Sequence, residues 1–182
     1  MEQTLAQYDA VIASCRQLFA DKTKDYGTSW RILRPSSLTD QMYIKAKRIR
    51  QIETTGSQMI EDSIAGEYTG LVNYGLMAIL QLQLPQMERL ELPSEEVLQY
   101  YDTEVGITRD LMVAKNSDYG EVWREMRLSS MTDLILAKLL RIKQIEDNAG
   151  QTIVSEGLSS NYRDIINYAI FCLIRLQENS IS

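Results

Sequence analysis

Residues 22–30 read KTKDYGTSW, and residues 115–123 read KNSDYGEVW. Lysine, aspartate, tyrosine, glycine and tryptophan return in the same frame, about 93 residues later. The same offset relates residues 22–53 to residues 115–146, and one extra residue near Ala149 shifts it for the final segments. Repetition at a constant spacing is the signature of a duplicated structural unit. The chain therefore consists of two copies of one unit, which together cover almost its whole length.

The first part of each copy has the pattern of an amphipathic helix. Apolar residues recur at intervals of three and four over residues 3–22, and residues 95–115 repeat this spacing. Gly27 and Gly120 then act as helix stops, because glycine readily adopts the left-handed conformation at a helix end. The sequence therefore predicts one long helix at the start of each copy.

Two more helices are predicted in each copy. Ser37-x-x-Asp40 and Ser130-x-x-Asp133 resemble capping boxes, which predicts helices over residues 38–54 and 131–148. The last helix of each copy is apolar on nearly every side and should lie in the middle of the protein. These central helices are predicted over residues 64–84 and 159–178.

No alternation typical of strands persists, so the predicted fold is all-α, a tandem duplication packed as a pseudo-twofold helical bundle. Residues 1–84 form the first repeat, 85–94 a linker bounded by prolines, and 95–182 the second repeat. A unit of about 90 residues buries only a limited core by itself. We therefore expect the two central helices to pack together, so that the repeats form one domain. A further homodimer of the chain is compatible with the sequence.

Composition restricts the classes of function. The chain has 182 residues, a formal net charge of -6 and no histidine. Lysines and arginines are scattered, so we expect no extended nucleic-acid surface. The longest apolar stretch, residues 165–174, is too short to cross a bilayer and no signal peptide is visible, so we expect no membrane association and a cytoplasmic location. Without histidine, a metal site would use oxygen ligands, which favours magnesium or manganese.

Both copies retain a lysine and an aspartate three residues apart at a helix end, Lys22 with Asp25 and Lys115 with Asp118. A carboxylate near a helix C-terminus opposes the helix dipole. Its occurrence in both copies predicts a partner, which could be the lysine, an arginine or a metal ion.

Further residues could bind the phosphates and the base of a nucleotide. Lysine and arginine recur three apart on the next helix, so they share one face, and the tryptophans could stack on a base. These candidates are Lys45, Arg48, Lys138, Arg141, Trp30 and Trp123, with Tyr26 and Tyr119 as further aromatic candidates. Structural interpretations remain open. The tryptophans could belong to the core, the cations could form a solvated face, and Asn73 and Asn167 could form hydrogen bonds across the pseudo-twofold axis.

The combined pattern resembles a known family. Both copies contain K-x-x-DYG-x-x-W-x-x-x-R-x-SS-x-TD, then K-x-x-RI-x-x-IE, and finally NY within an apolar helix. This pattern resembles the nucleotide modification associated domain (type one) family, over nearly the whole chain. The resemblance implies an all-α domain linked to nucleotide or modified-base metabolism.

A second, weaker similarity concerns the last helix of each copy. It looks like the E-x-x-D-x-x-x-Y stretch of all-α nucleoside triphosphate pyrophosphohydrolases of the MazG-like and dimeric dUTPase-like type. In those enzymes acidic helices bind magnesium, and water attacks the triphosphate to release pyrophosphate. The stretch corresponds to Glu67-x-x-Gly70-x-x-x-Tyr74 and to Asn161-x-x-Asp164-x-x-x-Tyr168, so each copy lacks one of the two acids.

Two functions follow. The first is a magnesium-dependent (d)NTP pyrophosphohydrolase in which Asp25, Asp118, Glu67 and Asp164 bind metal and perform catalysis, with Glu53 and Glu146 as further candidate ligands. A composite site with Glu67 and Asp164 brought together across the axis is one arrangement. Lys22, Lys115, Lys45, Lys138, Arg48 and Arg141 would bind phosphates. The second is a non-catalytic nucleotide-binding or protein-interaction module with a degenerate site.

Overall fold

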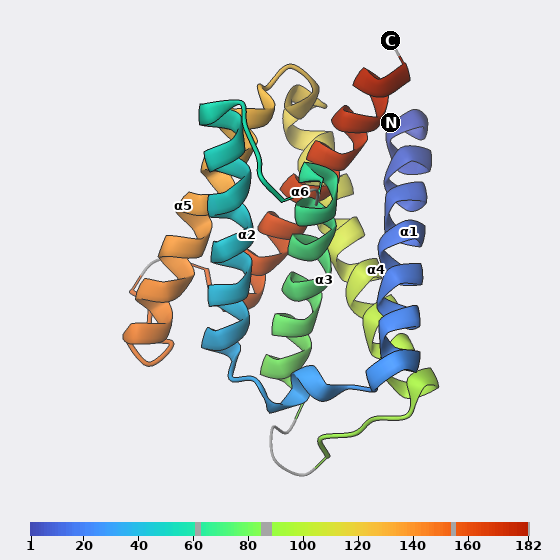
Figure 1. The fold of residues 1–182 in the computed structure, drawn as a ribbon, viewed down its shortest axis with the longest axis vertical. Coiled ribbons are helices and arrows are strands. Elements are labelled where there is room, and N and C mark those ends of the chain that lie inside the picture. The colour runs from blue at the N-terminus through green and yellow to red at the C-terminus, as the bar shows by residue number, and fades with distance from the viewer. Residues whose placement is uncertain (61–62, 85–88, 154–155, 182) are drawn as a thin grey trace.

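The duplicated sequence forms duplicated helices, as the computed structural model shows for residues 1–60, 63–84, 89–153 and 156–181 (Figure 1). The first repeat contains α1 (Glu2–Tyr26), the 3-10 turn η1 (Ser29–Ile32), α2 (Pro35–Thr55) and α3 (Ile64–Gln83). The second repeat contains α4 (Ser94–Tyr119), η2 (Val122–Arg124), α5 (Leu128–Asp147) and α6 (Leu158–Ile181). No strand occurs in these ranges, so the predicted all-α fold is confirmed.

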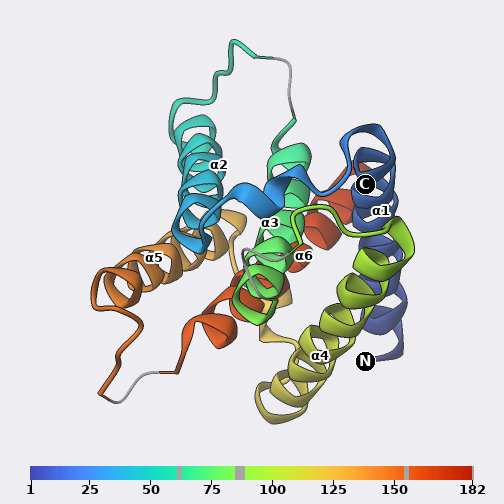
Figure 2. The same ribbon diagram turned by 90° about the horizontal axis from the view of Figure 1, so that it is seen from below.

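The last helix of each repeat lies in the centre of the bundle. In Figures 1 and 2, α3 and α6 run through the middle, with α2 and α5 on one side and α1 and α4 on the other. Leu71, Leu76 and Ile79 of α3 are fully buried, as are Ile165 and Ile170 of α6. Burying such a side chain contributes about 1.5–3 kcal/mol. The two apolar helices therefore cover each other, as the sequence predicts.

Gly75 allows the two central helices to approach closely. A Cβ atom at this position would lie 2.7 Å from Cγ1 of Ile166. That separation is well inside the usual contact distance of about 3.5–4.0 Å between carbon atoms. The absence of a side chain at Gly75 therefore leaves room for the α6 isoleucine.

The glycines of the repeated motif end their helices as predicted. Gly27 follows α1 with φ of 63° and Gly120 follows α4 with φ of 71°, which is the left-handed region that favours glycine. The aspartate and tyrosine before each glycine are thus the last helical residues.

The predicted capping boxes are wrong. α2 begins at Pro35 and α5 at Leu128, so Ser37 and Ser130 lie inside their helices. Proline is well suited to the first helical turn, because the N–H that it lacks has no helical partner there. Asp40 instead pairs with Lys143 (3.0 Å) and Asp133 with Arg50 (3.6 Å), which links α2 to α5.

Ion pairs between the first helices of the two repeats obey the same pseudo-twofold symmetry. Arg16 of α1 pairs with Asp102 of α4 at 2.6 Å, and Arg109 of α4 pairs with Asp9 of α1 at 2.7 Å. Each arginine and each aspartate has its equivalent in the other repeat. The two copies therefore contact each other as two subunits of a symmetric dimer would.

Within the described ranges, every helix is too short or too polar to qualify as a bilayer-crossing segment.

Candidate functional site: two equivalent cavities

Each repeat encloses a cavity between the end of its first helix, its 3-10 turn and its central helix. The cavity of the first repeat, here the first cavity, has a volume of about 480 Å³, and that of the second repeat, the second cavity, about 340 Å³. Equivalent residues line them. They are Lys22, Tyr26, Trp30, Asn73 and Tyr74 in the first cavity, and Lys115, Tyr119, Trp123, Asn167 and Tyr168 in the second. The repeated motif thus builds two copies of one site.

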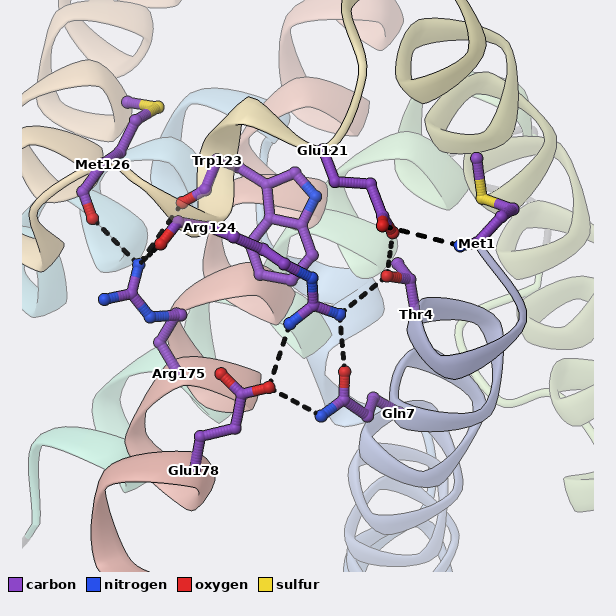
Figure 3. A network of polar contacts seen from close by, with 9 residues as sticks. All are labelled: Met1, Thr4, Gln7, Glu121, Trp123, Arg124, Met126, Arg175 and Glu178. Carbon is purple, nitrogen blue, oxygen red and sulfur yellow. Dashed lines mark hydrogen bonds and ion pairs between the residues drawn. The ribbon is translucent and has the colours of Figure 1, made fainter. Parts of the chain in front are cut away.

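The 3-10 turns that carry the tryptophans are anchored to the central helices. In the second repeat, Arg175 of α6 donates hydrogen bonds to the carbonyl oxygens of Arg124 (2.5 Å) and Met126 (2.9 Å), as Figure 3 shows. In the first repeat, Gln81 Nε2 of α3 donates to the carbonyl oxygens of Arg31 (2.8 Å) and Leu33 (2.6 Å). Different side chains therefore hold the same turn in place.

The second turn also contacts the N-terminal helix. Figure 3 shows Arg124 donating to Thr4, Gln7 and Glu178, while its guanidinium lies 4.3 Å from the centre of the Trp123 ring. The opposite repeat therefore helps to fix the position of this tryptophan.

Both tryptophans are buried, which confirms the core interpretation, and both also line a cavity. Trp123 stacks on Phe171 of α6, with ring centres 4.2 Å apart, and Trp30 lies beside Phe19 of α1, at 6.5 Å. Neither indole Nε1 has a hydrogen-bond partner among the described residues. An unpaired buried N–H is costly, and each indole therefore has an unused hydrogen-bond donor.

The two asparagines join the repeats. Tyr101 of α4 donates to Oδ1 of Asn73 at 2.9 Å, and Tyr8 of α1 donates to Oδ1 of Asn167 at 2.8 Å. The amide of Asn73 also donates to the carbonyl oxygen of Cys15 at 3.0 Å. The predicted hydrogen bonding across the pseudo-twofold axis is confirmed. The tyrosines were missed in the sequence analysis, although Tyr8 and Tyr101 occupy equivalent positions.

The charges of the second cavity centre on Asp164. Lys115 from α4 lies 2.5 Å from its Oδ1, and Lys138 from α5 lies 2.7 Å from its Oδ2. Asp164 itself is only 7% exposed. One buried carboxylate thus holds two lysines that come from different helices.

The first repeat has a different arrangement, because Gly70 stands at the position of Asp164. The acid one turn earlier, Glu67, instead accepts from Arg48 (2.5 Å) and from Lys45 (3.3 Å). Glu67 lies outside the cavity lining, whereas Lys45 lies within it. Lys45 and Arg48 are therefore partly buried and paired rather than part of a solvated face.

The aspartates of the repeated motif lie apart from these clusters. Asp25 and Asp118 are exposed, and neither forms an ion pair or hydrogen bond with another described residue. Lys22, which the sequence spacing predicts as a partner of Asp25, makes no ion pair with it. Arg141, another predicted phosphate ligand, is exposed and lies beside a different surface hollow near Gln151. The structure thus does not bring Asp25, Asp118 or Arg141 into the charge networks of the cavities.

Glu53 and Glu146 belong to a separate network between α2 and α5. Glu53 accepts from Thr132 at 3.0 Å, and Glu146 accepts from Thr39 at 2.7 Å. Burial raises the pKa of both glutamates. Their partners are equivalent threonines of the opposite repeat, so this network is a second link across the pseudo-twofold axis.

The predicted magnesium site does not match the donor arrangement of the described residues. No group of three or more acidic or cysteine side chains suitable for a metal ion occurs among them. Glu67 and Asp164 each already neutralise two cations in separate repeats. Magnesium binding by Asp25, Asp118, Glu67 and Asp164 stays a prediction.

Comparison with known proteins identifies the repeated unit. The model of the family described as nucleotide modification associated domain 1 matches residues 22–82 and 115–176. These segments contain most of the residues that line the two cavities. No curated protein and no solved structure matches the chain. The two family matches together span more than half of the sequence, so the chain belongs to the nucleotide modification associated domain 1 family and carries the domain twice.

Proposed function

We propose that the protein binds a nucleotide in the cavity built by the repeated motif. The observation that carries the proposal is that lysine and aromatic side chains line the same cavity, which has a volume suitable for a small molecule. The first cavity combines Lys22 and Lys45 with Trp30 and Tyr74. Lysines neutralise phosphates, and aromatic rings suit a base. Volumes of about 300–1,000 Å³ are typical of small-molecule sites.

The family supports the same class of ligand, because its description refers to nucleotide modification. The proposal concerns binding rather than pyrophosphate release. The acids needed to hold magnesium do not gather in the described residues, and the two central-helix acids are already paired with lysine or arginine. A non-catalytic nucleotide-binding module is thus the better supported of the two functions considered from the sequence.

The test is a titration of the protein with nucleotides in which binding is monitored by tryptophan fluorescence. The chain contains two tryptophans, and each lines one cavity. Trp30→Phe and Trp123→Phe variants each leave a single indole, so a change in emission identifies the occupied cavity. The ligands are a nucleoside and its mono- and triphosphates, with both ribose and deoxyribose.

We expect the phosphorylated compounds to change the emission and to raise the melting temperature, and the nucleoside to do so less. Lack of binding by every nucleotide would disprove the proposal. Pyrophosphate and monophosphate release with magnesium present is measured in parallel. Turnover there would show that the function extends to hydrolysis.

A further inference from the structure

The two cavities differ in charge, and the difference originates at one position of the central helix. Gly70 in α3 corresponds to Asp164 in α6, and both line their cavities. The described lining of the first cavity contains two lysines, Lys22 and Lys45, and no acid. The lining of the second contains Lys115 and Asp164. The side chains that line the first cavity thus carry a net positive charge, whereas the lysine and the carboxylate that line the second cancel each other.

In the second cavity the cations are already occupied. Asp164 binds Lys115 at 2.5 Å and Lys138 at 2.7 Å, and its carboxylate is nearly buried. An entering phosphate would have to separate at least one of these pairs. It would also face an uncompensated carboxylate at short range, which is strongly unfavourable in a partly desolvated site.

In the first cavity one lining lysine is unpaired among the described residues, and the other shares its carboxylate partner with an arginine. Lys22 makes no ion pair with another described residue. The side chain of Lys45 lies over Gly70, where a Cβ atom would come within 2.7 Å of its Cδ and Cε. Its Nζ is 3.3 Å from Glu67, whose other oxygen is bound more closely by Arg48 at 2.5 Å.

A carboxylate other than Glu67 also lies beside this cavity without lining it. Glu91 is next to Gly27, and it accepts a hydrogen bond from the backbone N–H of Thr28 at 3.2 Å. It is therefore engaged by the turn that precedes Trp30, and it forms no ion pair with Lys22 or Lys45.

We propose that the chain binds one polyphosphate-bearing ligand, in the first cavity, and that the glycine at position 70 selects this cavity over its equivalent. Lys22 and Lys45 bind the phosphates. The second cavity keeps the same walls but excludes polyphosphate through Asp164. This inference rests on the proposed nucleotide-binding function and specifies which of the two sites takes the phosphates.

The experiment exchanges the critical residue between the repeats. Sodium tripolyphosphate, which has no base or sugar, is titrated by calorimetry into the full chain at low ionic strength, and one representative deoxynucleoside triphosphate is titrated in the same way. The variants are Gly70→Asp, which introduces a carboxylate beside Lys45, and Asp164→Asn, which removes the charge from the second cavity. Circular dichroism and thermal melting check that each variant folds.

We expect the unmodified chain to bind one tripolyphosphate. Gly70→Asp should weaken this binding by about tenfold or more, the size of effect expected when a charge-assisted interaction is lost. Asp164→Asn should raise the stoichiometry from one to two. Lys22→Gln provides a second test if Gly70→Asp fails to fold, with Lys47→Gln as the matched control. Lys47 is exposed on the same helix as Lys45 and does not line the cavity.

The outcomes separate this inference from the proposed function. Two equal sites in the unmodified chain, or unchanged binding in a folded Gly70→Asp variant, would overturn the selection by position 70. If Gly70→Asp does not fold, unchanged binding in Lys22→Gln would overturn the assignment of the phosphates to the first cavity. Binding of a single tripolyphosphate without tighter binding of any nucleotide would retain the inference and remove the nucleotide function. Nucleotide binding with two sites per chain would do the reverse. No binding of either compound would refute both.

Discussion

The hydroxyl of Tyr8 in α1 donates a hydrogen bond of 2.8 Å to Oδ1 of Asn167 in α6. The equivalent bond joins Tyr101 in α4 to Asn73 in α3 at 2.9 Å. Each bond runs from one repeat to the other, and each asparagine also lines a cavity. The contacts that hold the two repeats together therefore also shape the candidate sites.

Removing the Tyr8 hydroxyl should destabilise the whole chain. Tyr8→Phe leaves the buried Oδ1 of Asn167 without its donor, which costs about 1–3 kcal/mol. Tyr101→Phe should cost a similar amount through Asn73. The free energy of unfolding in urea measures both. The control is Tyr26→Phe, because Tyr26 is 55% exposed. Equal stability of all three variants would contradict a role for these bonds in joining the repeats.

Arg163 should matter far more for stability than the exposed arginines. It binds Glu104 at 2.6 Å, and Glu104 is 1% exposed. Arg163→Met leaves a buried carboxylate unpaired, which costs about 3–5 kcal/mol. Arg16→Met breaks the exposed pair with Asp102 and should cost less than about 1 kcal/mol. Thermal and urea unfolding compare the two.

A double variant checks that the buried charge is the cause. Replacing Glu104 by leucine together with Arg163→Met removes both charges, so it should recover much of the lost stability. If the double variant is no more stable than Arg163→Met alone, lost packing rather than an unpaired carboxylate explains the effect.

Glu53 and Glu146 should make the protein less stable as the pH rises. Burial raises the pKa of both in the folded state, so the folded chain holds these protons at a higher pH than the unfolded chain. Stability then falls as the pH rises from the unfolded value of about 4.3 through the raised folded pKa, and stays low above it.

The Glu53→Gln, Glu146→Gln double variant should be more stable than the unmodified chain at pH 7, with no difference well below pH 4. The amide oxygen can still accept from Thr132 and Thr39. Urea unfolding across the pH range gives the difference between the two proteins. A difference that grows towards low pH would show that the sign is wrong.

Replacing the exposed aspartates of the motif should not destabilise the fold. Asp25 and Asp118 lie in the last turns of α1 and α4 and have no partner among the described residues. Asp25→Asn and Asp118→Asn should each raise stability by about 0.3–1 kcal/mol, because they remove a negative charge from a helix C-terminus. Melting with and without magnesium measures this. Stabilisation by magnesium that disappears in these variants would instead assign them the metal-ligand role.

The sequence by itself determined the secondary structure of this protein and its duplicated order. The apolar spacing predicted α1 and α4, and Gly27 and Gly120 end them as expected. Helix periodicity and helix stops depend on neighbouring residues, so they can be recognised in the chain. The predicted starts of α2 and α5 were wrong by three residues. A serine and an aspartate that lie inside each helix have the spacing of a capping box, and this spacing predicts an N-terminus at the wrong place.

Part of the candidate site was also visible in the sequence. Lys22, Trp30 and their equivalents line the cavities, as their repetition had indicated. Asp25 and Asp118 are repeated just as faithfully, but they lie on the exposed ends of their helices. Repetition marks positions that the two copies share and does not distinguish those that face a cavity from those that face solvent.

Only the tertiary structure decided which charges meet. Asp164 holds lysines from α4 and α5, whereas Glu67 holds two cations of α2, so the two copies of one motif differ in the charge of their cavities. Such pairings depend on the rotation and the axial position of each helix against its neighbours. Those are determined by the packing of side chains that are distant in sequence, and for this reason the periodicity of a single helix does not contain them.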